Sequence, residues 1–306
     1  MEITTAMIKE LRERTGAGIL DCKSALAETN GDMAEAEKLL RKKGLAAAAR
    51  KAGRSASEGL IGYEVTDAKA ALVELNCETD FVAKLEDFSR ARQVLAGMVF
   101  AAGELGDTLE GDVERLKAMS APATLPGSAG GTVSDWLQAF TAKTGENTQL
   151  RRFARLVAAP GNCLTAYVHP GEKTVVVIET KGCDPTLARD LAMHTAALSP
   201  LFATRDGVSQ KALEDEREIA RAKALAAGKP EGVAEKMVEG MIGKWYGEVV
   251  LLDQAFAKDD TKKVSQVIKE RAGHEAVVVR FVRYKVGEGV AKDKGDYAAE
   301  VAALAK

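Results

Sequence analysis

The stretch LIGYEV at residues 60–65, a turn at Thr66-Asp67 and the stretch ALVEL at residues 71–75 together decide the fold class. Both runs are short and apolar, and turn-forming residues separate them, which is typical of a β-hairpin. A helical period follows, with one apolar stripe made of Leu85, Phe88, Ala91, Leu95 and Met98. The sequence therefore predicts a β-hairpin followed by a helix.

A comparable order of elements returns further along the chain. Residues 163–168 and 175–179 have strand-like patterns on either side of a turn at 170–172. A helical stripe follows, made of Leu187, Leu191, His194 and Leu198. We therefore expect an α+β core of two related halves, each a β-hairpin plus a helix, with residues 277–284 as a strand that could complete the second sheet.

The N-terminal residues 4–44 contain three short apolar-periodic segments. Each ends at a glycine, Gly16, Gly31 or Gly44, and glycine is a common helix-stop signal. This pattern predicts a compact three-helix module with a thin core and an exposed apolar edge that suggests docking. The Ala-, Lys- and Arg-rich residues 44–59 are interpreted as a linker, in part helical.

Residues 208–248 carry two charged helical segments around Gly228-Lys229-Pro230, and their narrow apolar seams predict a helical hairpin, in the form of a protruding coiled coil. The chain ends in an alanine-rich helical pattern. We place the module and linker at 1–54 and the first core half at 55–140. The second half occupies 141–285 with the hairpin inserted at 208–248, and a short C-terminal helical module occupies 286–306.

Composition narrows the function classes. The chain has 306 residues, 46% of them hydrophobic, and a net charge of −2, so no global field attracts nucleic acid. The four cysteines stand far apart without metal-ligand spacing, which predicts reduced thiols, no metal site and a cytoplasmic location. Neither a signal peptide nor a membrane-spanning apolar run is present, so we expect no contact with a membrane.

Motifs for nucleotide binding and covalent chemistry are missing. The run GMIGK at 240–244 lies inside a helical pattern and lacks the strand that precedes a phosphate-binding loop. His169, His194 and His274 share no neighbourhood in sequence. His194 lies on a helix stripe, which favours a core histidine over a catalytic one, whereas His169 precedes a turn, where partner contact and turn stabilisation are equally plausible.

Two stretches carry a specific resemblance. LRERTGAGILDCKSAL at 11–26 and ELNCETDFVAK at 74–84 resemble the N-terminal module and the core motif of the elongation factor Ts family of bacterial translation. Shorter similarities lie at 145–147 with 151–152, 167–169, 192–194, 234–240, 280–281 and 286–289. The resemblance covers nearly the whole chain in the order of the family.

The resemblance implies a ubiquitin-associated-like three-helix module, a two-part α+β core, a helical hairpin and a short C-terminal module. It implies an exchange factor that promotes GDP release from elongation factor Tu, without covalent catalysis, a cofactor or direct nucleotide binding. Carried over by position, Thr79, Asp80, Phe81 and Val82 match the run with which the family disturbs the Mg²⁺ site of its partner.

Local physics supports part of this role. Thr79 or Asp80 can cap a helix that begins near Phe81, which would place the aromatic ring at a helix tip. The alternative is that Phe81, four residues before Leu85, continues the core stripe and that Asp80 is only a cap. The residues alone leave these two readings about even, and the resemblance favours the tip.

Further partner contacts are implied at Leu11, Ile19, Leu20 and His169. For the first three, an ordinary role in the core of the three-helix module is equally plausible, because a small bundle needs several apolar residues.

Three rival functions remain: a binding or scaffold module without exchange activity, an enzyme whose site is assembled from distant residues, and RNA binding through Arg151, Arg152 and Arg155. The neutral net charge argues against the last.

Overall fold

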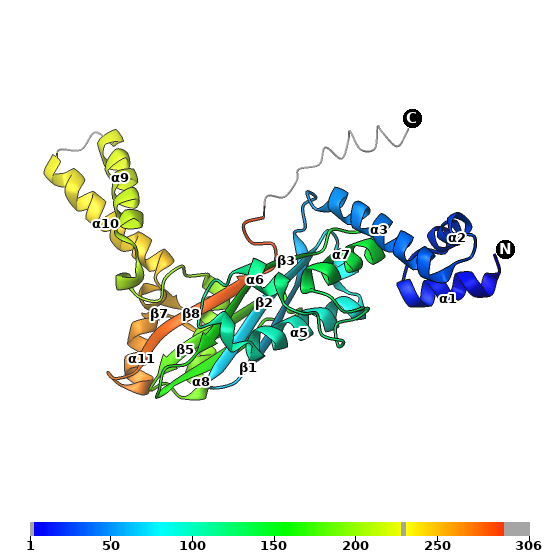
Figure 1. The fold of residues 1–306 in the computed structure, drawn as a ribbon. Coiled ribbons are helices and arrows are strands. Elements are labelled where there is room, and N and C mark those ends of the chain that lie inside the picture. Colours follow the sequence, from blue (N-terminus) through cyan, green and yellow to red (C-terminus); the bar gives the residue numbers. More distant parts are fainter. Residues whose placement is uncertain (1–2, 228–230, 291–306) are drawn as a thin grey trace. The chain divides into compact units, whose positions relative to one another are not determined.

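The computed structural model describes residues 3–227 and 231–290, which form two compact units. The first unit contains the described residues of Met1–Glu64, Ala71–Arg155 and Lys285–Lys306. The second contains those of Val65–Ala70 and Leu156–Tyr284. The fold is mixed α+β, with three N-terminal helices followed by small sheets and further helices (Figure 1).

The three predicted N-terminal helices are present as α1 (Thr5–Thr15), α2 (Ile19–Glu28) and α3 (Met33–Lys51). Local caps define their ends: the Thr4 hydroxyl accepts a hydrogen bond from the Met7 amide, and Gly16 closes α1 in the left-handed conformation at φ 69°. Their shared core consists of Leu11, Cys22, Ala25, Leu26, Ala36 and Leu40.

The third helix does not stop at Gly44, as the glycine had suggested, but continues to Lys51. Residues 45–51 are mostly Ala, Lys and Arg, which are strong helix formers. A Cβ atom at Gly44 would lie 3.0 Å from the Cβ atom of Ala142 in α7 (Val133–Thr144). The glycine therefore serves close packing of α3 on α7 rather than helix termination.

The first sheet has the order β1-β2-β3, with β1 at Glu58–Val65, β2 at Lys69–Cys77 and β3 at Gln149–Val157. The predicted hairpin is thus confirmed as β1 and β2. The alternate residues Ala71, Val73, Leu75 and Cys77 of β2 belong to a core cluster with α5 (Glu86–Ala101) and α7. Strand β3 lies in this first sheet, although we expected the second half to begin at residue 141.

The predicted helix after β2 is divided. A single turn, α4 (Asp80–Ala83), precedes α5, and Leu85 between them has an extended backbone with ψ 138°. Leu85 at this break is 45% exposed and does not belong to the core cluster that contains Phe88. That part of the predicted stripe was wrong. The core stripe of α5 begins at Phe88, and two short segments, η1 (Gly103–Leu105) and α6 (Val113–Ala118), link α5 to α7.

The second sheet has the order β4-β5-β8, with β4 at Asn162–Val168, β5 at Thr174–Lys181 and β8 at Val277–Lys285. β4 and β5 are antiparallel, from the pair Asn162–Lys181 to the pair Val168–Val175. The predicted strand at 277–284 is confirmed beside β5. Apolar residues of α8 (Pro185–Leu198) and α11 (Val264–Ala272) form a core cluster with residues of β5 and β8.

Smaller elements complete the second unit: η2 (Arg205–Gly207), η3 (Leu251–Asp253), β6 (Ala255–Phe256) and β7 (Asp259–Lys263). Helices α9 (Gln210–Ala226) and α10 (Glu231–Val249) pack against each other (Figure 1). Ala220 and Ala224 of α9 are buried. The expected turn at 228–230 and the expected alanine-rich end at 291–306 lie outside the described residues. Among the described helices, none is long and apolar enough to cross a membrane.

A buried carboxylate fastens the end of the described chain to the first sheet. Glu74 of β2 is fully buried and accepts hydrogen bonds from Arg151 (2.9 Å) and Arg152 (2.5 Å) of β3. It also accepts one from the backbone amide of Gly287 (2.8 Å). Gly287 has φ 70°, and a Cβ atom there would lie 2.2 Å from the Ser57 carbonyl oxygen. Only glycine fits this position.

Candidate functional site

The tip after β2 is a single helical turn whose cap is Thr79. Its Oγ1 atom accepts a hydrogen bond from the Val82 amide (3.4 Å), and its carbonyl accepts one from the Ala83 amide (3.3 Å). The sequence left Thr79 and Asp80 as alternative caps, and the structure assigns the cap to Thr79. Asp80 instead forms an ion pair with Lys84 at 2.6 Å.

Phe81 stands at the surface of this turn. Its side chain is 77% exposed, while Val82 and Ala83 are buried in the core. The reading of Phe81 as a core residue is therefore wrong. The ammonium group of Lys84 lies 5.8 Å from the centre of the phenyl ring, a contact that leaves most of the ring free. The turn thus anchors itself through Val82 and presents an aromatic group outward.

A second segment holds the tip from the side. The Glu146 carboxylate accepts hydrogen bonds from the Thr79 amide (2.9 Å) and the Thr79 hydroxyl (2.6 Å). In the opposite direction, the Glu78 carboxylate accepts one from the Asn147 amide (2.7 Å). Each segment therefore uses its own carboxylate to bind a backbone amide of the other.

The same segment also contacts the residues that follow α3. The Lys51 ammonium group donates a hydrogen bond to the Gly145 carbonyl (2.5 Å). The side chain of Asn147 donates hydrogen bonds to the carbonyls of Ala52 (3.3 Å) and Arg54 (2.7 Å). Residues 145–147 are thus a junction between the tip and the end of α3.

The three apolar residues expected in the N-terminal module divide into two groups. Leu11 is 0% exposed and belongs to the core of the three-helix module, as the alternative interpretation predicted. Its side chain is therefore not accessible to a partner. Ile19 and Leu20 open α2 and are 55% and 81% exposed. They form an apolar surface at the beginning of a helix.

His169 lies in the second unit, just after β4, where the turn to β5 begins. Its backbone amide donates a hydrogen bond to the Thr174 carbonyl (2.9 Å), and its Nδ1 atom lies 3.2 Å from the Tyr167 hydroxyl. The side chain is exposed. The backbone of His169 thus pairs across the turn and its ring is accessible, and contact of this ring with a partner stays a prediction.

His194 is a core histidine, as its helix stripe indicated. It is fully buried, and its Nδ1 atom accepts a hydrogen bond from the Ala257 amide (3.1 Å). The ring proton must then sit on Nε2, which donates to Oε1 of Gln254 (2.9 Å). Burial lowers the pKa of His194, and the hydrogen bond to Gln254 opposes this only in part. The buried ring is therefore neutral.

This neutral histidine predicts that the second unit loses stability in mild acid. Because the pKa of His194 is lower in the folded state, the unfolded chain binds more protons. The contribution of the neutral ring to the free energy of unfolding is therefore lost as the pH falls below the pKa of this histidine in the unfolded chain. Urea unfolding should therefore need less denaturant at about pH 5.5 than at about pH 7.5, a window in which ordinary histidines titrate. The variant His194→Gln should show a smaller difference. An equal pH dependence in both proteins would assign the effect to other groups.

The arginines considered for RNA binding are engaged inside the first unit. Arg151 and Arg152 bind the Glu74 carboxylate, and buried Arg155 donates a hydrogen bond to the Gly106 carbonyl (2.9 Å). Their charges hold the sheet together rather than form a free basic surface.

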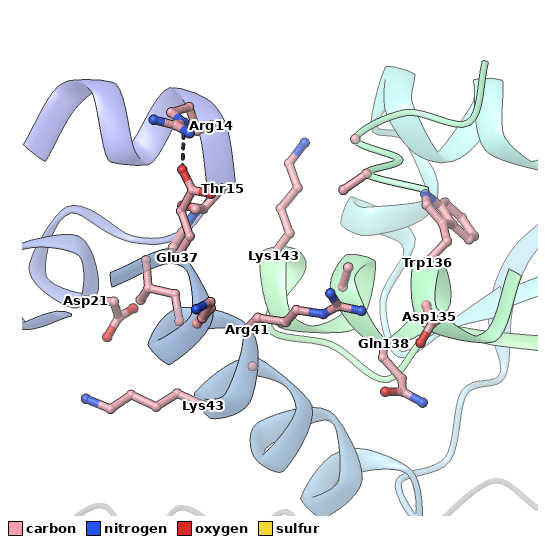
Figure 2. A pocket seen from close by; sticks show the side chains of 18 of the residues that line it. Arg14, Thr15, Asp21, Glu37, Arg41, Lys43, Asp135, Trp136, Gln138 and Lys143 are labelled. Atoms are coloured by element: carbon pink, nitrogen blue, oxygen red, sulfur yellow. Dashed lines mark hydrogen bonds and ion pairs between the residues drawn. The ribbon is translucent and has the colours of Figure 1, made fainter. Parts of the chain in front are cut away.

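A cavity of about 790 Å³ lies in the first unit between the three-helix module, α7 and the loop 127–130 (Figure 2). Several of its charged side chains have partners: Arg14 pairs with Glu37 at 2.6 Å, and Asp135 accepts hydrogen bonds from the amide and hydroxyl of Thr132. These bonds lower the pKa of Asp135. These contacts join α1 to α3 and cap α7.

Sequence reasoning assigned no role to two carboxylates that join the tip segment to residues 145–147, Glu78 and Glu146. Their partners lie 69 and 67 residues away in the sequence, so no spacing rule could pair them. The available signals were the family resemblance at 74–84 and 145–147, which contain the two residues, and Gly145, which ends α7 in the left-handed conformation immediately before Glu146.

Comparison with known proteins places the whole chain beside one set of relatives. A family model described as "Elongation factor TS" matches residues 78–288. Elongation factor Ts of Thioalkalivibrio sulfidiphilus is 46% identical over 308 residues, which cover 100% of this chain and 99% of the relative. The proteins of the same name from Methylococcus capsulatus and Rhodospirillum rubrum are each 44% identical and cover 99% and 100% of this chain. These matches extend over both compact units.

Proposed function

Since the chain belongs to the elongation factor Ts family, whose members are exchange factors and not enzymes, we propose that it binds elongation factor Tu–GDP and promotes GDP release through the tip Thr79–Val82. The observation that carries the role of the tip is the 77% exposed phenyl group of Phe81 on a turn anchored by buried Val82. GTP then rebinds to the emptied partner. We place this exchange in the cytoplasm.

In the proposed mechanism, Phe81 inserts between side chains of the partner and displaces the groups that hold Mg²⁺ and the β-phosphate. A bound Mg²⁺ ion is the largest local charge at such a site, so its displacement exposes the phosphate charge and weakens GDP binding. Asp80, Val82 and Thr79 serve this step by forming the turn that carries the ring. The factor itself contributes no covalent chemistry and needs no cofactor.

Thermodynamic linkage constrains this mechanism. If the factor weakens GDP binding by a certain ratio, GDP weakens binding of the factor by the same ratio. The complex of partner, GDP and factor must therefore be short-lived, and the nucleotide-free complex must be the stable one.

Other surfaces supply affinity in this proposal. Ile19 and Leu20 contact the nucleotide-binding domain of the partner, and His169 contacts another of its domains. We further propose that the three N-terminal helices form a ubiquitin-associated-like module and that α9 and α10 form a protruding coiled coil. Support comes from the exposure of Ile19 and Leu20 at the start of α2 and from the packing of α9 on α10.

The variant Leu20→Ser should weaken binding to nucleotide-free elongation factor Tu while the factor stays folded. Leu20 is 81% exposed, so its removal costs the free factor little, whereas a buried leucine contact in the complex contributes about 1.5–3 kcal/mol. Calorimetric titration should show a Kd increase of about tenfold or more. An unchanged Kd would remove Leu20 from the interface.

The proposed function is tested by mixing the full chain with elongation factor Tu that carries fluorescent GDP and an excess of unlabelled GDP. Release followed by stopped-flow fluorescence should become faster in proportion to the concentration of the chain until it saturates. A chain that co-purifies with the partner but leaves the release rate unchanged would be a binding module and not an exchange factor.

A further inference from the structure

We propose that Glu146 is a positioning residue for nucleotide exchange, which orients the Thr79 cap and thereby holds Phe81 outward. This inference rests on the proposed function of the tip. Glu146 belongs to the junction of residues 145–147 and reaches the tip through its carboxylate alone.

The hydroxyl group of Thr79 has one proton and must serve two neighbours. It donates that proton to Oε1 of Glu146 at 2.6 Å, which leaves a lone pair directed to the Val82 amide at 3.4 Å. Oε2 of Glu146 accepts the Thr79 amide at 2.9 Å and so fixes the backbone at the start of the turn. Both oxygens of one carboxylate therefore define the cap, and bonds to a charged acceptor are stronger than neutral ones.

Glu146 is itself held on a rigid base. The preceding helix, α7, ends at Gly145 in the left-handed conformation with φ 77°, and its residues Trp136 and Phe140 are buried in the core of the first unit. The Glu146 amide donates a hydrogen bond to the hydroxyl of Thr144 at 3.3 Å. The carboxylate thus reaches Thr79 from a fixed backbone, whereas α4 has only four residues and no buried face of its own beyond Val82 and Ala83.

Glu78 offers a matched control within the same junction. Its Oε1 atom accepts a hydrogen bond from the Asn147 amide at 2.7 Å, and its Oε2 atom pairs with Arg54 after α3 at 3.5 Å. Glu78 thus joins the tip segment to the same junction but touches neither the amide nor the hydroxyl of Thr79. Removal of Glu78 weakens the junction, and removal of Glu146 weakens the junction and releases the cap. The difference between the two variants isolates the effect of the cap.

The exchange kinetics should separate these roles. Glu146→Ala should lower the maximal rate of GDP release about tenfold, because the loss of strong hydrogen bonds frees the turn that carries Phe81. The concentration of factor at half-maximal rate should change by less than about twofold, since the other contact surfaces are unaltered. Glu78→Ala should keep the maximal rate within about twofold of the wild type despite a similar loss of thermal stability. Glu146→Gln keeps one acceptor oxygen and should lie between Glu146→Ala and the wild type.

A double-mutant cycle with Phe81→Ala tests whether Glu146 acts through Phe81. If it does, Glu146→Ala should slow exchange by less than about twofold when Phe81 is already absent. Two results would overturn the inference and leave Glu146 as a residue that only stabilises the fold. One is that the fold reductions of the exchange rate by Glu146→Ala and Phe81→Ala multiply in the double variant. The other is that Glu146→Ala and Glu78→Ala lower the maximal rate equally.

Hydrogen–deuterium exchange of the free proteins supplies a readout that needs no partner. Peptides that cover residues 79–84 should exchange faster in Glu146→Ala than in Glu78→Ala, because only the first variant opens the capped turn. Failure of the wild-type chain to accelerate GDP release would overturn the proposed function and the role of the cap in it. An active wild type with unchanged deuterium uptake at 79–84 in Glu146→Ala would overturn the assignment of Glu146 alone.

Discussion

GDP release from elongation factor Tu should slow by about thirtyfold when Phe81 of the factor is replaced by alanine, because the loss of an aromatic anchor at an interface costs about 2 kcal/mol or more. Phe81 projects from the capped turn with 77% of its side chain exposed, so the free factor uses little of its surface for folding. The loss should appear in the maximal rate, measured by stopped-flow fluorescence with labelled GDP, because the ring acts on the Mg²⁺ site rather than on general affinity.

The control for this variant is Leu85→Ala. Leu85 is a second exposed apolar residue beside the tip, 45% exposed, but it lies outside the turn α4. Its variant should exchange GDP at nearly the wild-type rate. Both variants should unfold within about 0.5 kcal/mol of the wild type, as expected for exposed positions. Equal rates for Phe81→Ala and the wild type would contradict the proposed insertion of Phe81 into the partner.

The largest effect on stability is expected for Glu74→Ala. This substitution removes a fully buried carboxylate and leaves Arg151 and Arg152 without the acceptor between them. Breaking a buried ion pair by removal of one partner costs about 3–5 kcal/mol, and the lower figure applies because both arginines are partly accessible to water. Urea unfolding of the full chain should show a correspondingly lower midpoint.

Glu74 also holds the C-terminal part of the first unit, so its loss should be visible there. The Gly287 amide loses its acceptor, and the arginines that bind the carbonyls of Lys285 and Glu288 lose their own anchor. Deuterium uptake at residues 285–288 should rise in Glu74→Ala. As a control, Glu110→Ala at an exposed position should change neither the midpoint of urea unfolding nor the deuterium uptake at residues 285–288. A Glu74→Ala protein as stable as the wild type would contradict the stabilising role of the buried Glu74 carboxylate.

The sequence predicted the elements with strong local signals. Both β-hairpins, the strand at 277–284 and the three N-terminal helices follow from alternation, helical period and turn residues, all of which act between near neighbours. Periodicity also identified His194 as a core residue. The glycine at 16 ended its helix as expected, since there the left-handed conformation is needed.

The remaining features depend on contacts between distant residues. Gly16 and Gly44 look alike in sequence, yet Gly44 lies inside its helix, where it allows α3 to pack closely on Ala142. Periodicity could not decide that Leu11 is buried and Leu20 exposed, because both lie in amphipathic segments of one small module. The cap residue Thr79 is bound by Glu146, which only the folded chain brings near.

The resemblance of the TDFV run to its family suggested a use for the tip that no local pattern could supply. Local physics predicted a capped turn with an aromatic group, and the structure shows that the group is exposed. The further step, from an exposed ring to displacement of Mg²⁺ in a GTPase, is the central claim of the proposed mechanism.

That claim is tested most directly by comparing the wild type with Phe81→Ala in the presence of Mg²⁺ and after its removal with EDTA. If Phe81 acts by disturbing the Mg²⁺ site, the wild type should release GDP about thirtyfold faster than the variant with Mg²⁺ present, and the two rates should converge once Mg²⁺ has been removed. A ratio that persists without Mg²⁺ would contradict the mechanism, because the ring would then act elsewhere on the partner.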